Sequence, residues 1–264
     1  MPTASVNGID VHYERGGEGP PLLFCNGSGA TLVSSAPLIA RFRQHFDVLA
    51  HDQRGLGRTT IPPGPYSMAD YAADAVALLD AVGWDRCAVV GISFGGMVAQ
   101  ELAVTWPERI TRLALVCTSP GGAGGASYPL HDLAELPADE AAELGVRLLD
   151  PRFTPEWLAS HPRDRALVEA RGAGAAVTRS DEVRRGEREQ LAARRGHDVW
   201  ERLARIACPT FVAAGRYDGI APLANAEALA SRIEGAELRR YEGGHLFFLQ
   251  DRAAFPDLVR FLAG

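Results

Sequence analysis

Ser93 is the residue whose surroundings best suit nucleophilic chemistry. It stands at the centre of residues 91–95, which fit the pattern G-x-S-x-G. An apolar run at 87–90 precedes this stretch and a segment with helical periodicity, 97–106, follows it, which predicts a sharp turn between a strand and a helix. Glycine suits the outer positions because a Cβ there would strike the strand or the helix. An ordinary Gly/Ser turn can match so short a pattern by chance. The predicted strand before it and helix after it favour a turn that carries a nucleophile.

A serine hydroxyl needs a base within hydrogen-bond reach, and that base needs an acid that orients it. His245 is the one histidine of seven that follows the last predicted strand, at 237–241, inside Gly-Gly-His. Asp218 closes a loop directly after another predicted strand, whereas the strand ending at Cys117 is followed by hydroxyl residues and no carboxylate. We therefore expect Ser93, Asp218 and His245 to form a catalytic triad. The alternatives are a surface-turn aspartate and a histidine at a helix N-terminus.

The tetrahedral intermediate of acyl transfer needs two N–H donors. Phe94, directly after the serine, is expected to supply one of them from its main chain. Ser28, in the loop 26–29 after the apolar run 22–25, is expected to supply the other. Glycines on both sides of Ser28 allow close approach of the backbone, although an ordinary Gly/Ser turn would have the same composition.

The elements that must position these residues alternate along the chain. Asn7-Gly8 between two alternating segments predicts a hairpin. Short apolar runs, each followed by a loop and most then by a helical pattern, predict strands buried on both faces at 22–25, 46–50, 87–90, 113–117 and 210–214. We expect an α/β fold whose mostly parallel central sheet is covered by helices on both faces. The predicted catalytic residues all follow strands, so they would meet at the carboxyl edge of that sheet.

The alternation of strands and helices stops between about Pro120 and Leu203. A glycine-rich passage at 121–125 is followed by charged helical segments without a strand. We expect a core formed by residues 1–120 and 204–264, and a helical cap, or lid, formed by residues 121–203. The alternative is a further set of packing helices without a lid role.

Composition excludes several classes of protein. The chain has 264 residues, a net charge of −6 and no basic stripe, so nucleic acid is not an expected partner. All 27 basic residues are arginine, which excludes a lysine Schiff base and the lysine of a phosphate-binding loop. The four cysteines lie far apart without zinc spacing, and we expect no metal and no cofactor. With no visible signal peptide and no apolar run of membrane-spanning length, we expect a cytoplasmic protein that does not bind membranes.

Five motifs together resemble the α/β-hydrolase superfamily, and the resemblance covers nearly the whole chain. They are residues 26–29, 52–57, 91–97, 215–218 and 243–245. Within the superfamily, the histidine-free loop at 26–29 and the stretches 62–67 and 244–249 are similar to 3-oxoadipate enol-lactonases and their lactonase and esterase relatives. The resemblance implies the α/β-hydrolase fold with a cap, and a serine hydrolase.

Some residues depart from the pattern of these families. Asn26-Gly27 replaces the common His-Gly pair, and Phe94 stands where many of the lactonases carry methionine. Both changes leave the N–H donors available but alter the wall of the pocket. A serine at position 93 argues against haloalkane dehalogenases and epoxide hydrolases, whose nucleophile is aspartate.

The expected function is hydrolysis of a small carboxylic ester or lactone through an acyl-enzyme on Ser93. One alternative on the same site is carbon–carbon bond hydrolysis or perhydrolase (haloperoxidase-like) activity. Another, of a different class, is a ligand-binding receptor with slow hydrolysis. The expected partner is the small-molecule substrate, and a homo-oligomer is left open.

The substrate pocket is expected between the triad loops and the cap. Its candidate lining residues are Gly27, Phe94, Tyr128, Trp157, Trp200, Ile220 and Phe247. Apolar walls of this kind favour a small, largely apolar acyl or lactone group, although each tryptophan can instead pack within the cap. Four cap arginines are either partners of a substrate carboxylate or plain solvated charges: Arg147, Arg152, Arg163 and Arg179.

Overall fold

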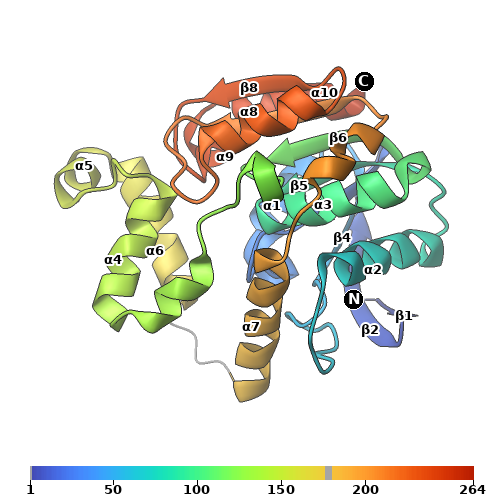
Figure 1. The fold of residues 1–264 in the computed structure, drawn as a ribbon, viewed down its shortest axis with the longest axis horizontal. Coiled ribbons are helices and arrows are strands. Elements are labelled where there is room, and N and C mark those ends of the chain that lie inside the picture. The colour runs from blue at the N-terminus through green and yellow to red at the C-terminus, as the bar shows by residue number, and fades with distance from the viewer. Residues whose placement is uncertain (1, 176–179) are drawn as a thin grey trace.

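The central element of the protein is one eight-stranded sheet in the order β1-β2-β4-β3-β5-β6-β7-β8 (Figure 1). The computed structural model describes residues 2–175 and 180–264. The strands are β1 (Thr3–Val6), β2 (Ile9–Gly16), β3 (Pro21–Cys25), β4 (Asp47–His51), β5 (Cys87–Ile92), β6 (Ile110–Val116), β7 (Thr210–Gly215) and β8 (Glu237–Tyr241). β1 and β2 are antiparallel to their neighbours and all other pairs are parallel. The predicted mostly parallel sheet is confirmed.

The hairpin at the start of the chain follows from its two turn residues. Asn7 and Gly8 have φ angles of 49° and 76°, the left-handed values that a tight hairpin turn needs at both central positions. Val6 pairs with Ile9 across this turn. The hairpin then continues into the sheet because β2 pairs with β4.

Helices cover both faces of the sheet, as the buried strands predict. One face packs against α2 (Met68–Ala81), α3 (Phe94–Thr105) and α8 (Leu223–Arg232), and the other packs against α1 (Leu32–Phe42), α9 (Phe247–Gln250) and α10 (Ala254–Ala263). Neighbouring residues of one strand alternate between the two cores: Val89 belongs to the first and Val90 to the second. Burial of each such side chain stabilises the fold by about 1.5–3 kcal/mol.

A helical region stands between β6 and β7. After the short 3-10 helices at Gly122–Gly124 and Leu130–Glu135, it contains α4 (Ala138–Leu149), α5 (Pro155–Ser160), α6 (Pro162–Ala175) and α7 (Asp181–Arg195). In Figure 1, α4, α5 and α6 lie together at one side of the molecule, whereas α7 runs separately toward the side of α2. Within the described part of residues 121–203 no strand forms, although one isolated bridge pairs Gly121 with Asp198.

The helical region has its own small apolar cluster, built on Leu148, Leu149 and Phe153, and Ile220 of the loop after β7 belongs to the same cluster. By contrast, the residues around the 3-10 helix Trp200–Arg205 pack in the core beside α3. We therefore propose that the cap ends just before Val199 rather than at residue 203, with its lid role still a prediction. Among the described residues, no helix combines the length and apolarity needed to cross a membrane.

Candidate active site

Ser93 occupies the turn between β5 and α3, with a φ of 55° and a ψ of −114°. A left-handed φ at a residue other than glycine is strained, and such strain typically occurs at functional sites. A Cβ added at Gly91 would overlap the main-chain oxygen of Gly95, and one added at Gly95 would overlap that of Cys25. The two glycines therefore allow the helix to start against the sheet and leave the serine at the tip of the turn.

The structure brings Ser93, His245 and Asp218 together in one hydrogen-bonded series. His245 Nε2 lies 3.0 Å from Ser93 Oγ, and His245 Nδ1 lies 2.8 Å from Asp218 Oδ2. All three residues are buried. Asp218 Oδ1 also accepts hydrogen bonds from the main-chain N–H groups of Ile220 and Ala221, both at 2.8 Å. These bonds fix the carboxylate, which in turn favours a proton on Nδ1 and leaves Nε2 to accept from the serine.

Electrostatics tune the imidazole of His245. Burial opposes its protonation, but the adjacent Asp218 carboxylate favours it, and the net effect raises the pKa of His245 above its ordinary value of 6.5. The main-chain N–H of His245 donates to the oxygen of Leu149, at the end of α4, at 2.6 Å. The histidine loop is thus fixed to the helical region as well as to the sheet.

Cys117 is a fourth polar group beside this series. It follows β6 and has a φ of 43°. Its Sγ, one carboxylate oxygen of Asp218 and one ring nitrogen of His245 all lie within 4.8 Å of one another. Metal binding would require a thiolate, but burial raises the pKa of Cys117, only partly opposed by His245. We therefore interpret the thiol as packing against the back of the hydrogen-bonded series.

The two predicted N–H donors flank Ser93. Gly27, next to Ser28, is so close that a Cβ there would lie 3.7 Å from Ser93 Cβ. In the part of the chain that the structure describes, neither Ser28 nor Phe94 donates its main-chain N–H to another protein group. The following N–H, of Gly29, donates to Gln190 Oε1 of α7 at 2.7 Å, which fixes the loop. Both N–H groups are thus without a protein acceptor, and their role as oxyanion donors stays a prediction.

Three of the candidate pocket residues lie in the cluster between the core and the helical region. Tyr128, Trp157 and Ile220 belong to the apolar cluster that also contains Leu246, next to His245. The main-chain N–H of Tyr128 donates to the oxygen of Ile220 at 2.7 Å. Trp157 is stacked on His161 at 3.8 Å and its Nε1 donates to Asp164, so it packs mainly within the helical region.

The rings of the other three aromatic candidates do not reach the site. The Phe94 ring is fully buried in the core, 4.9 Å from Tyr71. Phe247 is also fully buried and stacks on Tyr241 at 5.2 Å on the opposite face of the sheet. Trp200 packs on Gly124, with Arg232 4.8 Å above its ring. Large apolar rings are strongly driven into the core, and sequence proximity to a motif does not indicate the direction of the side chain.

None of the four candidate arginines is seen with a free guanidinium in the site: two are exposed, one is paired with a carboxylate and one lies outside the described residues. Arg147 and Arg163 are exposed, and Arg179 lies outside the described residues. Arg152 forms a two-point ion pair with the fully buried Asp150 and lies 3.7 Å above Tyr217. Sequence reasoning missed two buried polar residues of α7, Gln190 and Arg194. Their spacing of four is a signal for one helix face, but nothing in the sequence separates Arg194 from its many charged neighbours.

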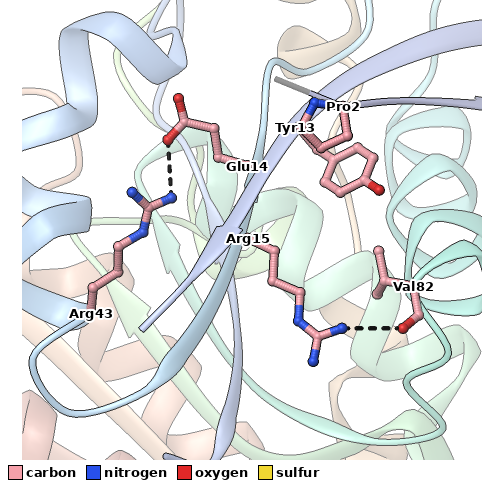
Figure 2. A pocket seen from close by; sticks show the side chains of 6 residues that line it. All are labelled: Pro2, Tyr13, Glu14, Arg15, Arg43 and Val82. Atoms are coloured by element: carbon pink, nitrogen blue, oxygen red, sulfur yellow. Dashed lines mark hydrogen bonds and ion pairs between the residues drawn. The ribbon is translucent and has the colours of Figure 1, made fainter. Parts of the chain in front are cut away.

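A cavity of about 410 Å³ lies away from these residues, against the antiparallel strand β2 (Figure 2). Figure 2 shows Arg43 paired with Glu14 at 3.0 Å and Arg15 donating to the oxygen of Val82 at 3.4 Å. The lining residues are Pro2, Tyr13, Glu14, Arg15, Arg43 and Val82. They include no serine, cysteine or histidine, so this cavity offers no counterpart to the series at Ser93.

Comparison with known proteins defines the class. Residues 20–252 match the model of the alpha/beta hydrolase fold family. The chain therefore belongs to the α/β-hydrolase family, and it is a hydrolase. This family assignment confirms the resemblance that the sequence motifs indicate.

Individual relatives are named as a depolymerase and as enol-lactonases. The chain is 31 % identical over 249 residues to a poly(3-hydroxyalkanoate) depolymerase of Ectopseudomonas oleovorans, covering 92 % of this chain and 84 % of that protein. It is 27 % identical to 3-oxoadipate enol-lactonase 2 of Acinetobacter baylyi, covering 97 % and 94 %. Among solved structures, the enol-lactonase from Burkholderia xenovorans LB400 superposes with a TM-score of 0.81 at 26 % identity, covering 100 % of both chains.

Proposed function

We propose that this protein hydrolyses a small carboxylic ester or lactone through a covalent acyl-enzyme on Ser93. The observation that carries the proposal is the hydrogen-bonded series from Ser93 Oγ through His245 to Asp218, at 3.0 and 2.8 Å. Two N–H groups without protein partners beside the serine support the same chemistry. The relatives named as a 3-oxoadipate enol-lactonase and a poly(3-hydroxyalkanoate) depolymerase support an ester or lactone as the bond that is cleaved.

The reaction proceeds in two halves. In the first, His245 Nε2 takes the proton of Ser93 Oγ as the oxygen attacks the carbonyl carbon, and the N–H groups of Ser28 and Phe94 stabilise the oxyanion. The tetrahedral intermediate then collapses, and His245 gives its proton to the leaving oxygen. The products of this half are an ester on Ser93 and an alcohol, which for a lactone stays attached to the acyl group.

In the second half, water replaces the alcohol. His245 takes one proton from water as its oxygen attacks the acyl carbon, and then returns that proton to Ser93 Oγ as the carboxylic acid leaves. Asp218 keeps the imidazole oriented and stabilises its positive charge in both halves. The helical region between β6 and β7 acts as the cap that bounds the substrate, since Ile220 and Leu246, beside two triad members, pack against it.

Turnover and labelling test the proposal. The purified protein is assayed with p-nitrophenyl acetate and a panel of lactones, beside Ser93→Ala and a control, Ser231→Ala, whose hydroxyl is exposed on α8. We expect hydrolysis, and labelling by a serine-directed fluorophosphonate, in the wild type and the control but not in Ser93→Ala. Equal inactivity of all three proteins toward every substrate, with a ligand still stabilising the fold, would favour a receptor instead. Labelling that persists in Ser93→Ala would contradict the assignment of the nucleophile. A cytoplasmic location and a homo-oligomer stay predictions that these assays leave aside.

A further inference from the structure

Residues 148–152, at and just after the C-terminal end of α4, contact both loops that carry the proposed acid and base, and we call this segment the strap. The main-chain oxygen of Leu148 accepts from the N–H of Gly219, directly after the acid, at 3.1 Å. The oxygen of Leu149 accepts from the N–H of His245 at 2.6 Å. The last carbonyl groups of a helix have no partner within it, so they are free for such contacts. Two consecutive carbonyl groups of one helix end therefore bind both loops.

Glycines in the two loops allow the strap to approach their main chains directly. A Cβ added at Gly244 would overlap the oxygen of Leu149 and lie 2.7 Å from the Cβ of Asp150. One added at Gly219 would lie 2.8 Å from the oxygen of Leu148. No side chain separates the strap from either loop at these points, so a shift of the strap moves the loops with it.

A buried ion pair fixes the strap itself. Asp150 is fully buried, and Arg152 donates to its two oxygens from Nε and Nη2 at 2.9 and 2.7 Å. The main-chain N–H of Arg152 donates to the same carboxylate at 3.0 Å. The guanidinium also lies 3.7 Å above the ring of Tyr217, the residue before Asp218. The pair thus joins the strap to the loop of the acid.

Gln250, at the end of α9, makes the corresponding connection to the loop of the base. Its Oε1 accepts from the main-chain N–H of Gly244, the residue before His245, at 2.9 Å. Its Nε2 donates to Asp150 Oδ2 and to Asp164 Oδ1 of α6, both at 3.4 Å. Polar contacts therefore run without interruption from the helical region to the main chain beside the base.

The location of the ion pair indicates a role beyond stability. Buried ion pairs contribute little net stability, because desolvation offsets the attraction, and their best-attested effect is to specify one arrangement. Here the arrangement that they specify includes His245, which must reach Ser93 Oγ and Asp218 together, at 3.0 and 2.8 Å. An error of about 1 Å in the position of a reacting group can cost a rate factor of about 100.

We propose that Asp150 and Arg152 are positioning residues for His245: their ion pair fixes the strap, and the strap holds the loops of the acid and the base at catalytic distance. The proposal rests on the proposed hydrolase function and names residues of the helical region on which that function depends. A helical region that only bounds the substrate would act on KM, whereas a strap that positions the base acts on kcat.

Turnover per active site tests this role. Arg152→Gln is assayed with p-nitrophenyl acetate, and active sites are counted by titration with a fluorophosphonate, so that unfolded molecules do not contribute. We expect kcat to fall by about 10- to 100-fold, with KM changed less than about threefold. Arg152→Lys keeps the cation but not the two-point contact, and should recover part of kcat.

A matched control separates positioning from stability. Glu101 of α3 forms a two-point ion pair with Arg202, both contacts at 2.7 Å, and is also buried. Neither residue belongs to the strap or to the loops of the acid and base. Glu101→Gln should therefore lower the melting temperature but keep the wild-type kcat per active site.

The pH profile distinguishes positioning from a simple loss of charge. Removal of a positive charge favours protonation of a nearby imidazole and would raise the pKa of His245, whereas a weaker contact with Asp218 would lower it. We expect Arg152→Gln to move the acidic midpoint of kcat/KM to lower pH. The charged and titratable groups around the two loops are Asp218, Cys117, Asp150, Arg152 and Glu242.

A measurement without substrate reads the same effect. In protein with isotope-labelled histidine, the ring-nitrogen resonances of His245 are assigned by their absence from His245→Gln and followed by NMR against pH. Arg152→Gln should lower the pKa of His245, and Glu101→Gln should not. Gln250→Leu, at a half-buried position, keeps the buried ion pair but leaves the N–H of Gly244 without its acceptor. It should lower this pKa by a smaller amount.

The outcomes separate the positioning role from the hydrolase function. An unchanged or raised pKa of His245 in both Arg152→Gln and Gln250→Leu would overturn the positioning role and leave the hydrolase function standing. An equal loss of kcat in Glu101→Gln would overturn it as well, because the effect would then be one of general stability. A lowered pKa of His245 in a protein that hydrolyses no ester would support the positioning role and count against the hydrolase.

Discussion

The proposed triad and the inner face of α7 both bury polar groups, but they satisfy them differently. At the triad, Asp218 uses both oxygens, His245 uses both ring nitrogens and Ser93 Oγ is hydrogen-bonded. On and just after α7, Arg194 has free donors and the nitrogens of His197 have no partner at hydrogen-bonding geometry. A complete network suits groups that must stay in place during a reaction, whereas buried groups without partners lower the stability of the fold.

The largest effect is expected from removal of the nucleophile. Ser93→Ala should lower kcat by roughly 10⁴- to 10⁶-fold, because no other group of the completed network can form the acyl-enzyme. It should leave the melting temperature almost unchanged, since the hydroxyl carries one hydrogen bond. The measurement is steady-state turnover of an activated ester together with a thermal melt. A loss of less than about tenfold would place the nucleophile elsewhere.

The next largest effect is expected at Asp218. The Asp218→Asn change removes the charge that orients His245, and we expect kcat to fall by roughly 10³- to 10⁴-fold. The neutral imidazole is the base, so activity is lost as the pH falls through the pKa of His245. The carboxylate raises that pKa, and its removal should therefore move the acidic midpoint of the kcat/KM profile to lower pH. A midpoint that stays in place or moves to higher pH would contradict this electrostatic role.

Acid stability distinguishes the second region. Burial lowers the pKa of His197 to about 4, from 6.5, against weaker opposing contacts with Glu101 and Ser119. Because the unfolded chain binds the proton more readily, the stability that depends on neutral His197 is complete above pH 6.5 and is lost as the pH falls toward 4. The loss amounts to roughly 3 kcal/mol in the free energy of unfolding.

Chemical denaturation at pH 7 and at pH 4.5 measures this loss, with His197→Gln as the comparison. The amide does not titrate, so the variant should show a smaller difference between the two pH values. His51 has a pKa lowered in the same way and supplies a background that both proteins share. An equal pH dependence in wild type and variant would contradict the assignment to His197.

The smallest expected effect lies at the contact between the two regions. Gln190→Leu leaves the N–H of Gly29 without its acceptor, and the loop that carries Ser28 should lose its fixed position. We expect kcat/KM to fall by about tenfold, with the larger part in kcat. Arg188→Ala, at an exposed position two residues earlier, is the matched control and should show wild-type kinetics.

The fold and the triad loops follow from local sequence signals, whereas the packing of the inner face of α7 does not. The apolar strands, the Asn7-Gly8 turn and the glycines around Ser93 each specify their own conformation, so the order of elements places Asp218 and His245 at one sheet edge. The positions of Phe247 and Trp200 depend on which neighbours fill the core, which no local pattern encodes. Arg194 was missed for a similar reason, because its burial results from how α7 packs on the loops after β3 and β6.

The central claim is that Ser93 becomes acylated during turnover, and intact-mass measurement of the quenched enzyme tests it most directly. After rapid mixing with an activated ester and acid quenching, we expect a mass increase equal to the acyl group, located by peptide mapping to the peptide containing Ser93. His245→Ala should greatly reduce this adduct, because the hydroxyl then has no base. Rapid turnover without any adduct, or an adduct on a peptide that lacks Ser93, would contradict the account.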